Sequence, residues 1–183
     1  MNNISLYSDS MTANTRLNCA KQRAENLAIL LQPGARVLEM CVGPSLHRLE
    51  IEYAKYGITC FGNDIDPRWE TYYPEGKWMI GDALNLDVSG FDAIIFAPPL
   101  SKGCSGRRED SLSLDQVNPS YWSFLQAYRN FMGVKAMVLP GRTLSLRHDR
   151  DELYRLLNGL SNYNVVPLKD KVTKYVDIYI ESC

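Results

Sequence analysis

The sequence lacks any hydrophobic run near the ~20 residues that a helix needs to cross a bilayer, and its first residues lack the apolar stretch of a secretion signal. It also lacks a charge excess, because 20 lysines and arginines meet 21 aspartates and glutamates. These absences exclude a membrane-spanning chain and argue against a protein that coats nucleic acid through bulk charge. We therefore expect a cytoplasmic protein. These absences do not exclude a local basic patch.

Cysteine and histidine are also scarce in ways that limit the chemistry. The five cysteines are odd in number and far apart, and no two form a C-x-x-C pair. This favours reduced thiols over a disulfide frame or a zinc site, so no metal site is predicted. His47 and His148 are the only histidines, and capping or surface roles suit them better than general-base catalysis. Glu109 and Asp110 are equally weak candidates for a base.

What is present is ordinary globular composition. The 183 residues are 45% hydrophobic and 22% charged, without internal repeats, linkers or low-complexity tracts. A chain of this length suits one domain, since domains commonly span about 100–200 residues. We expect a single domain over residues 1–183, with an N-terminal segment and helix at 1–34 and a catalytic core at 35–183.

Hydrophobic patterning alternates between helical and strand periods along the core. Helix-like segments occur at 14–31, 45–56, after Pro67, at 119–131 and at 149–160. Strand-like segments occur at 35–39, 58–61, 78–80, 93–96 and 136–139. This alternation predicts an α/β fold in which a parallel sheet is covered by helices on both faces.

The C-terminal pattern differs from the rest. The strand-like runs 164–169 and 172–180 are separated by only two residues, which is too short for a parallel crossover. They are therefore expected to form an antiparallel hairpin. Pro167 lacks an N–H group and places the first of these strands at the edge of the sheet.

Carboxylates follow the first three predicted strands, at Glu39, Asp64 and Asp82, and a double proline, Pro98-Pro99, follows the fourth. Any one of these alone is adequately explained by a turn or a helix cap. In an open parallel sheet, however, ligands bind outside the carboxyl ends of the strands. The joint occurrence of these residues at successive strand ends therefore indicates a ligand site.

These residues resemble the motifs of class I S-adenosylmethionine-dependent methyltransferases. In that family the first strand runs into a loop written D/E-x-G-x-G-x-G. The segment VLEMCVGPS matches it in Glu39 and Gly43, while Cys41 and Ser45 stand where glycines are usual. The resemblance covers 35–180 and implies a Rossmann-like three-layer sandwich. Its mostly parallel sheet of seven strands is expected to have the order 3-2-1-4-5-7-6, with the antiparallel hairpin at its end.

The resemblance also assigns the cofactor contacts. Asp64 corresponds to the acid that accepts hydrogen bonds from both ribose hydroxyls, and Ile65 would pack on the adenine. Asp82 would accept from the exocyclic amine of the adenine, and the Ala83 N–H would donate to a ring nitrogen. Glu39 and Cys41 belong to the loop beside the methionine end, and Gly43 lets the backbone approach the cofactor closely.

The acceptor is expected beside the double proline, which in relatives that methylate amines of nucleic-acid bases reads D/N/S-P-P-Y/F/W. The corresponding residues here are Ala97, Pro98, Pro99 and Leu100. Ala97 cannot accept a hydrogen bond and Leu100 cannot stack as an aromatic does, but the backbone carbonyl can still hold an amine. Tyr121 or Trp122, on the next helix, would then supply the aromatic side chain.

Cations follow the fourth and fifth strands, at Lys102, Arg107, Arg108 and Arg142. One hypothesis is that they bind an anionic acceptor such as a nucleotide phosphate or a carboxylate. The other is a solvated surface of mixed charge, and the sequence favours neither. The segment 7–12, before the first predicted helix, is expected to fold over the cofactor as it does in relatives.

The preferred function is methyl transfer to a nucleic-acid base or another planar amine. Methyl transfer to a small molecule is an alternative. So is a degenerate module that binds the cofactor without catalysis, which Ala97 and the glycine-poor loop favour. A dinucleotide-binding Rossmann domain ranks lower because it needs G-x-G-x-x-G after the first strand. The acceptor, a nucleic acid or nucleotide among others, and the oligomeric state stay open.

Overall fold

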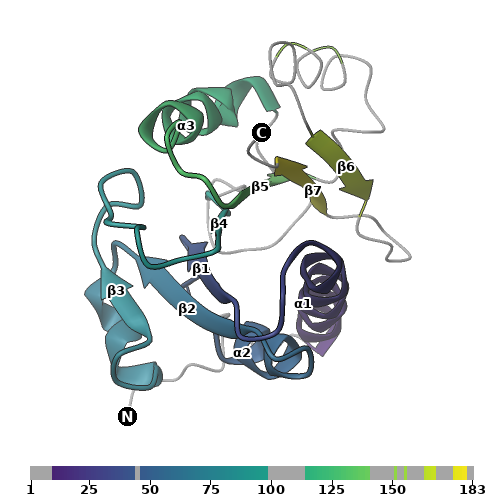
Figure 1. Ribbon diagram of the computed structural model, residues 1–183, viewed down its shortest axis with the longest axis vertical. Helices are drawn as coiled ribbons and strands as arrows, with labels where there is room; N and C mark the ends of the chain where they lie inside the picture. Colours follow the sequence, from purple (N-terminus) through teal and green to yellow (C-terminus); the bar gives the residue numbers. More distant parts are fainter. Residues whose placement is uncertain are drawn as a thin grey trace.

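Seven strands form one sheet in the computed structural model, with the order β3-β2-β1-β4-β5-β7-β6 (Figure 1). The structure describes residues 10–43, 46–98, 114–140, 151, 155, 163–167 and 175–180. The strands are β1 (Arg36–Met40), β2 (Thr59–Asp64), β3 (Trp78–Ile80), β4 (Ala93–Phe96), β5 (Val134–Pro140), β6 (Tyr163–Pro167) and β7 (Tyr175–Ile180). Strands β1 to β5 pair in parallel, whereas β7 is antiparallel to both β5 and β6. The predicted α/β fold, strand order and terminal hairpin are confirmed, and β6 with Pro167 lies at the edge.

The helices are α1 (Ser10–Leu30), α2 (Leu46–Ala54), a 3-10 helix η3 (Pro67–Tyr72) and α3 (Leu114–Ala127). Helix α1 begins at Ser10 rather than at 14, so part of the segment 7–12 belongs to the helix and the rest lies outside the described residues. Helix α3 begins before Pro119, which was predicted to be in its first turn. The predicted start was therefore wrong, since proline at the first turn of a helix is a preference and not a rule. The helix predicted at 149–160 lies largely outside the described residues.

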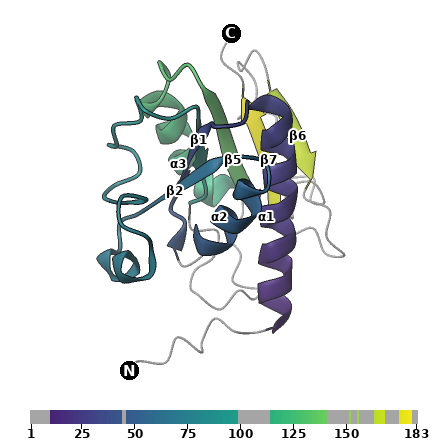
Figure 2. The ribbon, with the colours of Figure 1, turned by 60° about the horizontal axis from the view of Figure 1, so that its bottom comes forward.

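The sheet separates two apolar cores because side chains alternate along each strand. Leu38 and Met40 face α3, where they pack with Phe124. Val37 faces α1 and α2, where it packs with Leu27 and other apolar side chains. Figures 1 and 2 show α1 and α2 together on one face and α3 on the other. The central strand β4 (AIIF) is buried along its whole length, as expected of a strand covered on both faces.

The sheet requires a glycine where β5 begins. A Cβ atom on Gly133 would lie 2.2 Å from the carbonyl oxygen of Asp92 and 2.7 Å from Cζ of Phe131. The neighbouring Val134 N–H donates to that same carbonyl at 2.9 Å. The Asp92 carbonyl cannot move away without breaking this hydrogen bond, which lies beside the first pair of the β4–β5 register.

We predict that Gly133→Ala lowers the free energy of unfolding by about 1–3 kcal/mol, the range for overpacking, as measured by urea denaturation. Gly90→Ala is the matched control, because its Cβ would meet first the Arg36 guanidinium, at 3.3 Å, which is the end of a flexible side chain. Equal losses of stability in the two variants would contradict the close approach at Gly133.

Candidate functional site

The carboxyl ends of β1, β2 and β3 bring together side chains that are far apart in the sequence. The backbone N–H of Gly43 donates to Oδ2 of Asp64 at 2.9 Å. Cys41 lies within electrostatic reach of both Asp64 and Asp82. Burial, followed by the negative charges of these two carboxylates, raises the pKa of its thiol to about 12. Cys41, Asp64 and Asp82, which follow three different strands, therefore lie in one region of the fold.

Asp64 is the last residue of β2, and its half-buried carboxylate is held by two backbone groups. Oδ1 accepts from the Asp66 N–H at 3.0 Å, and Oδ2 accepts from the Gly43 N–H. Each oxygen of a carboxylate can accept about two hydrogen bonds. Asp64 therefore has a fixed orientation and keeps acceptor capacity on both oxygens for a ligand with two donors.

The loop after β1 has left-handed backbone angles at Cys41, with φ 58°, and at Gly43, with φ 51°. Its middle residue is held to β2, because the Val42 N–H donates to the Asn63 carbonyl at 3.0 Å. A Cβ on Gly43 would come no closer than 3.9 Å to Asp64 Oδ2. Within the protein, glycine is therefore favoured here by the backbone angle rather than by crowding. Cys41 adopts a glycine-like angle although it carries a side chain.

Asp82 follows β3 with an exposed carboxylate. Its Oδ1 accepts from the Leu84 N–H at 3.0 Å, and its Oδ2 accepts from Nδ2 of Asn85 at 2.8 Å. The carboxylate therefore caps the turn, which is the structural explanation that the sequence allowed. Its exposed oxygens remain accessible to a further donor.

Ala83, the next residue, is held by a side chain on the α3 face of the sheet. The Tyr128 O–H donates to the Ala83 carbonyl at 2.5 Å, and the Leu86 N–H donates to the same tyrosine oxygen at 3.2 Å. Burial raises the pKa of the Tyr128 hydroxyl, which keeps it protonated and able to donate. The turn after β3 is therefore positioned by a side chain that follows α3.

Apolar side chains flank the two aspartates. Ile65, directly after Asp64, is 71% exposed. Ile80, which pairs with Asp64 in the sheet register, is 45% exposed and was not predicted. Both offer apolar surface next to the carboxylates.

Glu39 has a different environment from the one expected. Its side chain is 1% exposed, and its carboxylate accepts from the Tyr53 hydroxyl of α2 and from Nη1 of Arg23 of α1 at 3.5 Å. Burial and the charge of Glu39 raise the pKa of Tyr53 well above its usual value, so the hydroxyl stays a donor. Glu39 thus joins β1 to both helices on the α1/α2 face. A contact of Glu39 with the methionine end of a cofactor stays a prediction.

The end of β4 lies beside the end of β1. The Ala97 N–H donates to the Met40 carbonyl at 3.3 Å, and Pro98 is buried. The methyl group of Ala97 packs against the apolar core under α1 and α2. The other residues predicted for this region lie outside the described residues: Pro99, Leu100, Lys102, Arg107, Arg108 and Arg142.

Helix α3 offers one of its two candidate aromatics. Tyr121 is fully buried and donates its O–H to the Val138 carbonyl at 2.6 Å. Tyr121 and Trp122 were predicted as alternatives for stacking on a substrate, and the ring of Tyr121 lies in the core beside Phe96. Trp122, the next residue, is 46% exposed and can present its indole to a ligand.

Sequence reasoning missed two supporting residues. Tyr73 follows η3, and its hydroxyl donates to the Gly43 carbonyl. Asn63, fully buried in β2, donates Nδ2 to the Met79 carbonyl at 3.0 Å and to the Gly81 carbonyl at 2.9 Å. Asn63 is a polar residue two positions after the predicted strand 58–61, which was a usable signal, whereas nothing local marks Tyr73.

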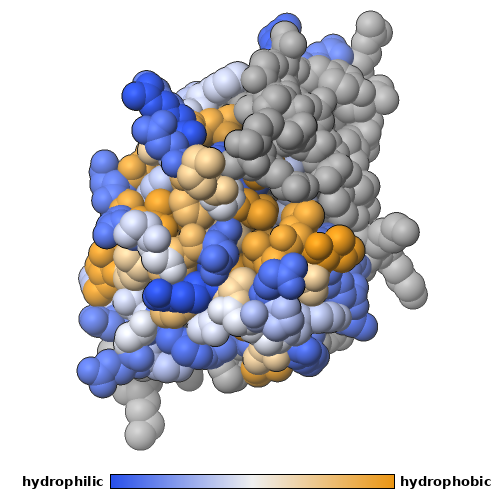
Figure 3. Space-filling view, in the orientation of Figure 1, coloured by the Kyte–Doolittle hydropathy of each residue, from blue (hydrophilic) through white to orange (hydrophobic). Residues whose placement is uncertain are grey.

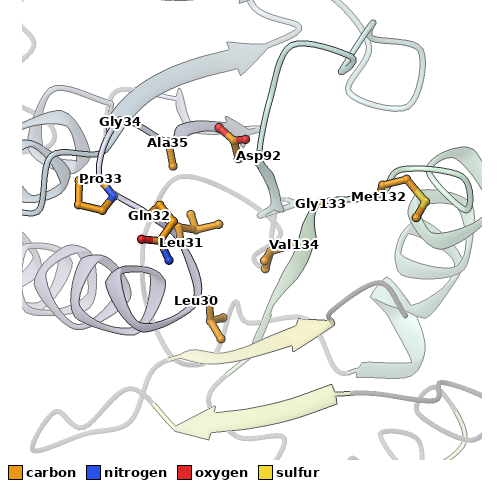
Figure 4. A pocket seen from close by; sticks show the side chains of 10 residues that line it. All are labelled: Leu30, Leu31, Gln32, Pro33, Gly34, Ala35, Asp92, Met132, Gly133 and Val134. Atoms are coloured by element: carbon orange, nitrogen blue, oxygen red, sulfur yellow. The ribbon is translucent and has the colours of Figure 1, made fainter.

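A cavity among the described residues lies elsewhere. It measures about 540 Å³ and lies between the turn after α1, around Pro33, and the starts of β4 and β5, at Asp92 and Val134 (Figure 4). It is thus at the amino end of the parallel strands, opposite the cluster of Cys41 and Asp64. Hydrophilic and apolar residues are intermixed over the described part of the face in Figure 3. The residues of the strand-end cluster, which the sequence predicts to bind a ligand, do not line this cavity.

Comparison with known proteins gave matches among solved structures alone, since no family model and no curated protein matches the chain. TrmN from Thermus thermophilus is 20% identical with TM-score 0.57, over 89% of this chain and 48% of that one. Human methyltransferase-like protein 13 in complex with SAH is 17% identical with TM-score 0.58, over 90% and 82%. A SAM-dependent methyltransferase from Archaeoglobus fulgidus is 12% identical with TM-score 0.55, over 91% and 94%. The chain has the fold of S-adenosylmethionine-dependent methyltransferases.

These likenesses establish the fold and leave the acceptor unidentified. The chain spans about half the length of TrmN, at 48%. In the part of the chain that the structure describes, no helix is both long and apolar enough to span a membrane. In the same part, no group of three or more histidine, cysteine, aspartate or glutamate side chains could hold a metal ion.

The buried Glu39 contact yields a stability prediction. Glu39→Gln removes the charge that partners Arg23, which is itself 7% exposed. Breaking this buried ion pair should lower the free energy of unfolding by about 3–5 kcal/mol in urea denaturation. Glu25→Gln is the control, because Glu25 pairs with Lys21 at 3.8 Å on the exposed side of α1. That change should cost at most about 1 kcal/mol. Comparable losses in the two variants would contradict the anchoring role of Glu39.

Proposed function

We propose that this chain is an S-adenosylmethionine-dependent methyltransferase whose cofactor site is the cluster after β1, β2 and β3. The observation that carries the proposal is the hydrogen bond from Gly43 to Asp64, with Asp82 close enough to act on the same Cys41 thiol. It unites a left-handed loop and two carboxylates at the edge where parallel sheets bind ligands. The fold supports the same assignment.

The donors and acceptors of this cluster fit the cofactor. Asp64 would accept from the two ribose hydroxyls, using the acceptor capacity that its two backbone donors leave. The exposed Ile65 would pack on one face of the adenine. Asp82 would accept from the exocyclic amine, and the Ala83 N–H would donate to a ring nitrogen. The cofactor, when bound, supplies a methyl group already activated on a sulfonium, so the protein mainly positions the acceptor and excludes water.

A dinucleotide fits less well. A pyrophosphate is bound by free backbone N–H groups of the loop after the first strand. In this chain the Gly43 N–H is bonded to the Asp64 carboxylate, and the Val42 N–H is bonded to the Asn63 carbonyl. The nearby carboxylates would also repel a phosphate, whereas they attract a sulfonium.

The preferred acceptor is a nucleic-acid base or another planar amine. The support is the Ala97-Pro98 segment at the end of β4 and the half-exposed Trp122, whose ring can stack on a base. An exposed indole serves a planar small molecule equally well, so a small-molecule acceptor is the alternative. A second candidate function, cofactor binding without catalysis, is favoured by the apolar packing of Ala97, which supplies no side-chain acceptor to an amine.

Isothermal calorimetry with S-adenosylmethionine and S-adenosylhomocysteine tests the proposed site. We expect binding by the wild type and a loss of about 10–100-fold in affinity in Asp64→Ala and in Asp82→Ala, because hydrogen bonds to charged groups contribute about 1.5–3 kcal/mol. Asp87→Ala is the control, since Asp87 is exposed and caps the Ser89 N–H outside the cluster. No binding at millimolar cofactor, or equal losses in all three variants, would refute the assignment.

Methyl release then separates an enzyme from a binding module. The wild type is incubated with labelled cofactor and a panel of single-stranded nucleic acids, nucleosides and small planar amines. Transfer to any member, reduced in Asp64→Ala, supports the enzyme. Binding without transfer to any of them favours the module.

A further inference from the structure

The loop after β1 is held by a side chain from another part of the chain. Tyr73, in the connection between η3 and β3, donates its hydroxyl to the Gly43 carbonyl. Its ring stacks on Trp78, the first residue of β3, with ring centroids 4.6 Å apart and an interplanar angle of 27°. The stacked pair therefore connects the edge strand β3 to the loop at the centre of the proposed cofactor site.

Tyr73 and Asp64 form hydrogen bonds with the carbonyl and the N–H of the same residue, Gly43. The Gly43 N–H donates to Asp64 Oδ2 at 2.9 Å, while the Gly43 carbonyl accepts from Tyr73. One step earlier in the loop, the Val42 N–H donates to the Asn63 carbonyl. Three hydrogen bonds from β2 and from the η3–β3 connection thus fix a very short segment.

Such external support matters because the loop conformation is unfavourable for its sequence. Cys41 has φ 58°, a left-handed angle that side chains other than glycine rarely adopt. The loop contains one glycine, Gly43, within residues 41–43. Unfavourable backbone angles persist only where the surrounding structure holds them in place.

We propose that Tyr73 is a positioning residue of the cofactor site, which holds the Gly43 carbonyl so that the loop keeps its shape and Asp64 keeps its orientation. This inference rests on the proposed function. Additional glycines would make the left-handed loop conformation more favourable. In this chain the Tyr73 hydroxyl keeps that conformation populated in the free protein. The binding of cofactor is stronger when the binding-competent conformation is already populated.

The test is Tyr73→Phe, which keeps the ring and its stacking on Trp78 and removes only the hydroxyl. By calorimetry we expect the Kd for S-adenosylhomocysteine to rise about 5–10-fold, measured well below the melting temperature of either protein. Tyr56→Phe is the matched control, because Tyr56 is a half-buried tyrosine at the end of α2 that packs against the α1/α2 core. Its Kd should equal that of the wild type.

The proposal would be overturned by an unchanged Kd in Tyr73→Phe, whether or not its melting temperature falls. An equal rise of Kd in Tyr56→Phe would also overturn it. Amide hydrogen exchange in the ligand-free protein separates this test from that of the function. Tyr73→Phe should speed exchange of the Gly43 N–H severalfold, and unchanged exchange would show that the hydroxyl does not hold the loop. A wild type that binds no cofactor would overturn the function and Tyr73's role in it, whatever the exchange result.

Discussion

The hydrogen bond between the Gly43 N–H and the Asp64 carboxylate joins the end of β1 to the end of β2, and the proposed site is organised around it. It orients the Asp64 carboxylate and occupies the Gly43 N–H, which would otherwise be available to a pyrophosphate. Cys41, in the same loop, lies near the negative charges of Asp64 and Asp82. The contact depends on the parallel register of the two strands, in which Met40 lies opposite Asn63. A shift of register would separate the loop from the acid.

Residues on both faces of the sheet hold the strand ends around this contact. On one face, Glu39 fixes β1 to α1 and α2 through Arg23 and Tyr53. On the other, Tyr128 reaches the turn after β3 through the Ala83 carbonyl. The site is thus built on strand ends whose positions are set by buried polar contacts and not only by apolar packing. Buried polar groups of this kind are favourable only when they are paired, which makes each support sensitive to the loss of its partner.

Local patterns were sufficient to predict the α/β class, the positions of most strands and the terminal hairpin, whereas the strand order followed from the family resemblance. The apolar run at 93–96 matches β4, because a strand covered on both faces must be hydrophobic throughout. The run at 78–80 matches the edge strand β3. The candidate site followed from the ends of β2 and β3, which fix where Asp64 and Asp82 lie. What could not be predicted depends on contacts distant in sequence. Tyr121 and Trp122 are adjacent on α3, and only the packed structure decides which of them is buried.

The central claim is that the cofactor binds at the carboxyl edge of the sheet, although the cavity around Pro33 and Gly133 lies at the opposite edge. The most direct measurement is the set of backbone amide chemical-shift changes as S-adenosylhomocysteine is added to the isotope-labelled protein. The account predicts the largest changes at Gly43, Asp64 and Ala83, with none at Gly34 or Gly133. Changes that centre on Gly34 and Gly133, or no changes at saturating ligand, would contradict it.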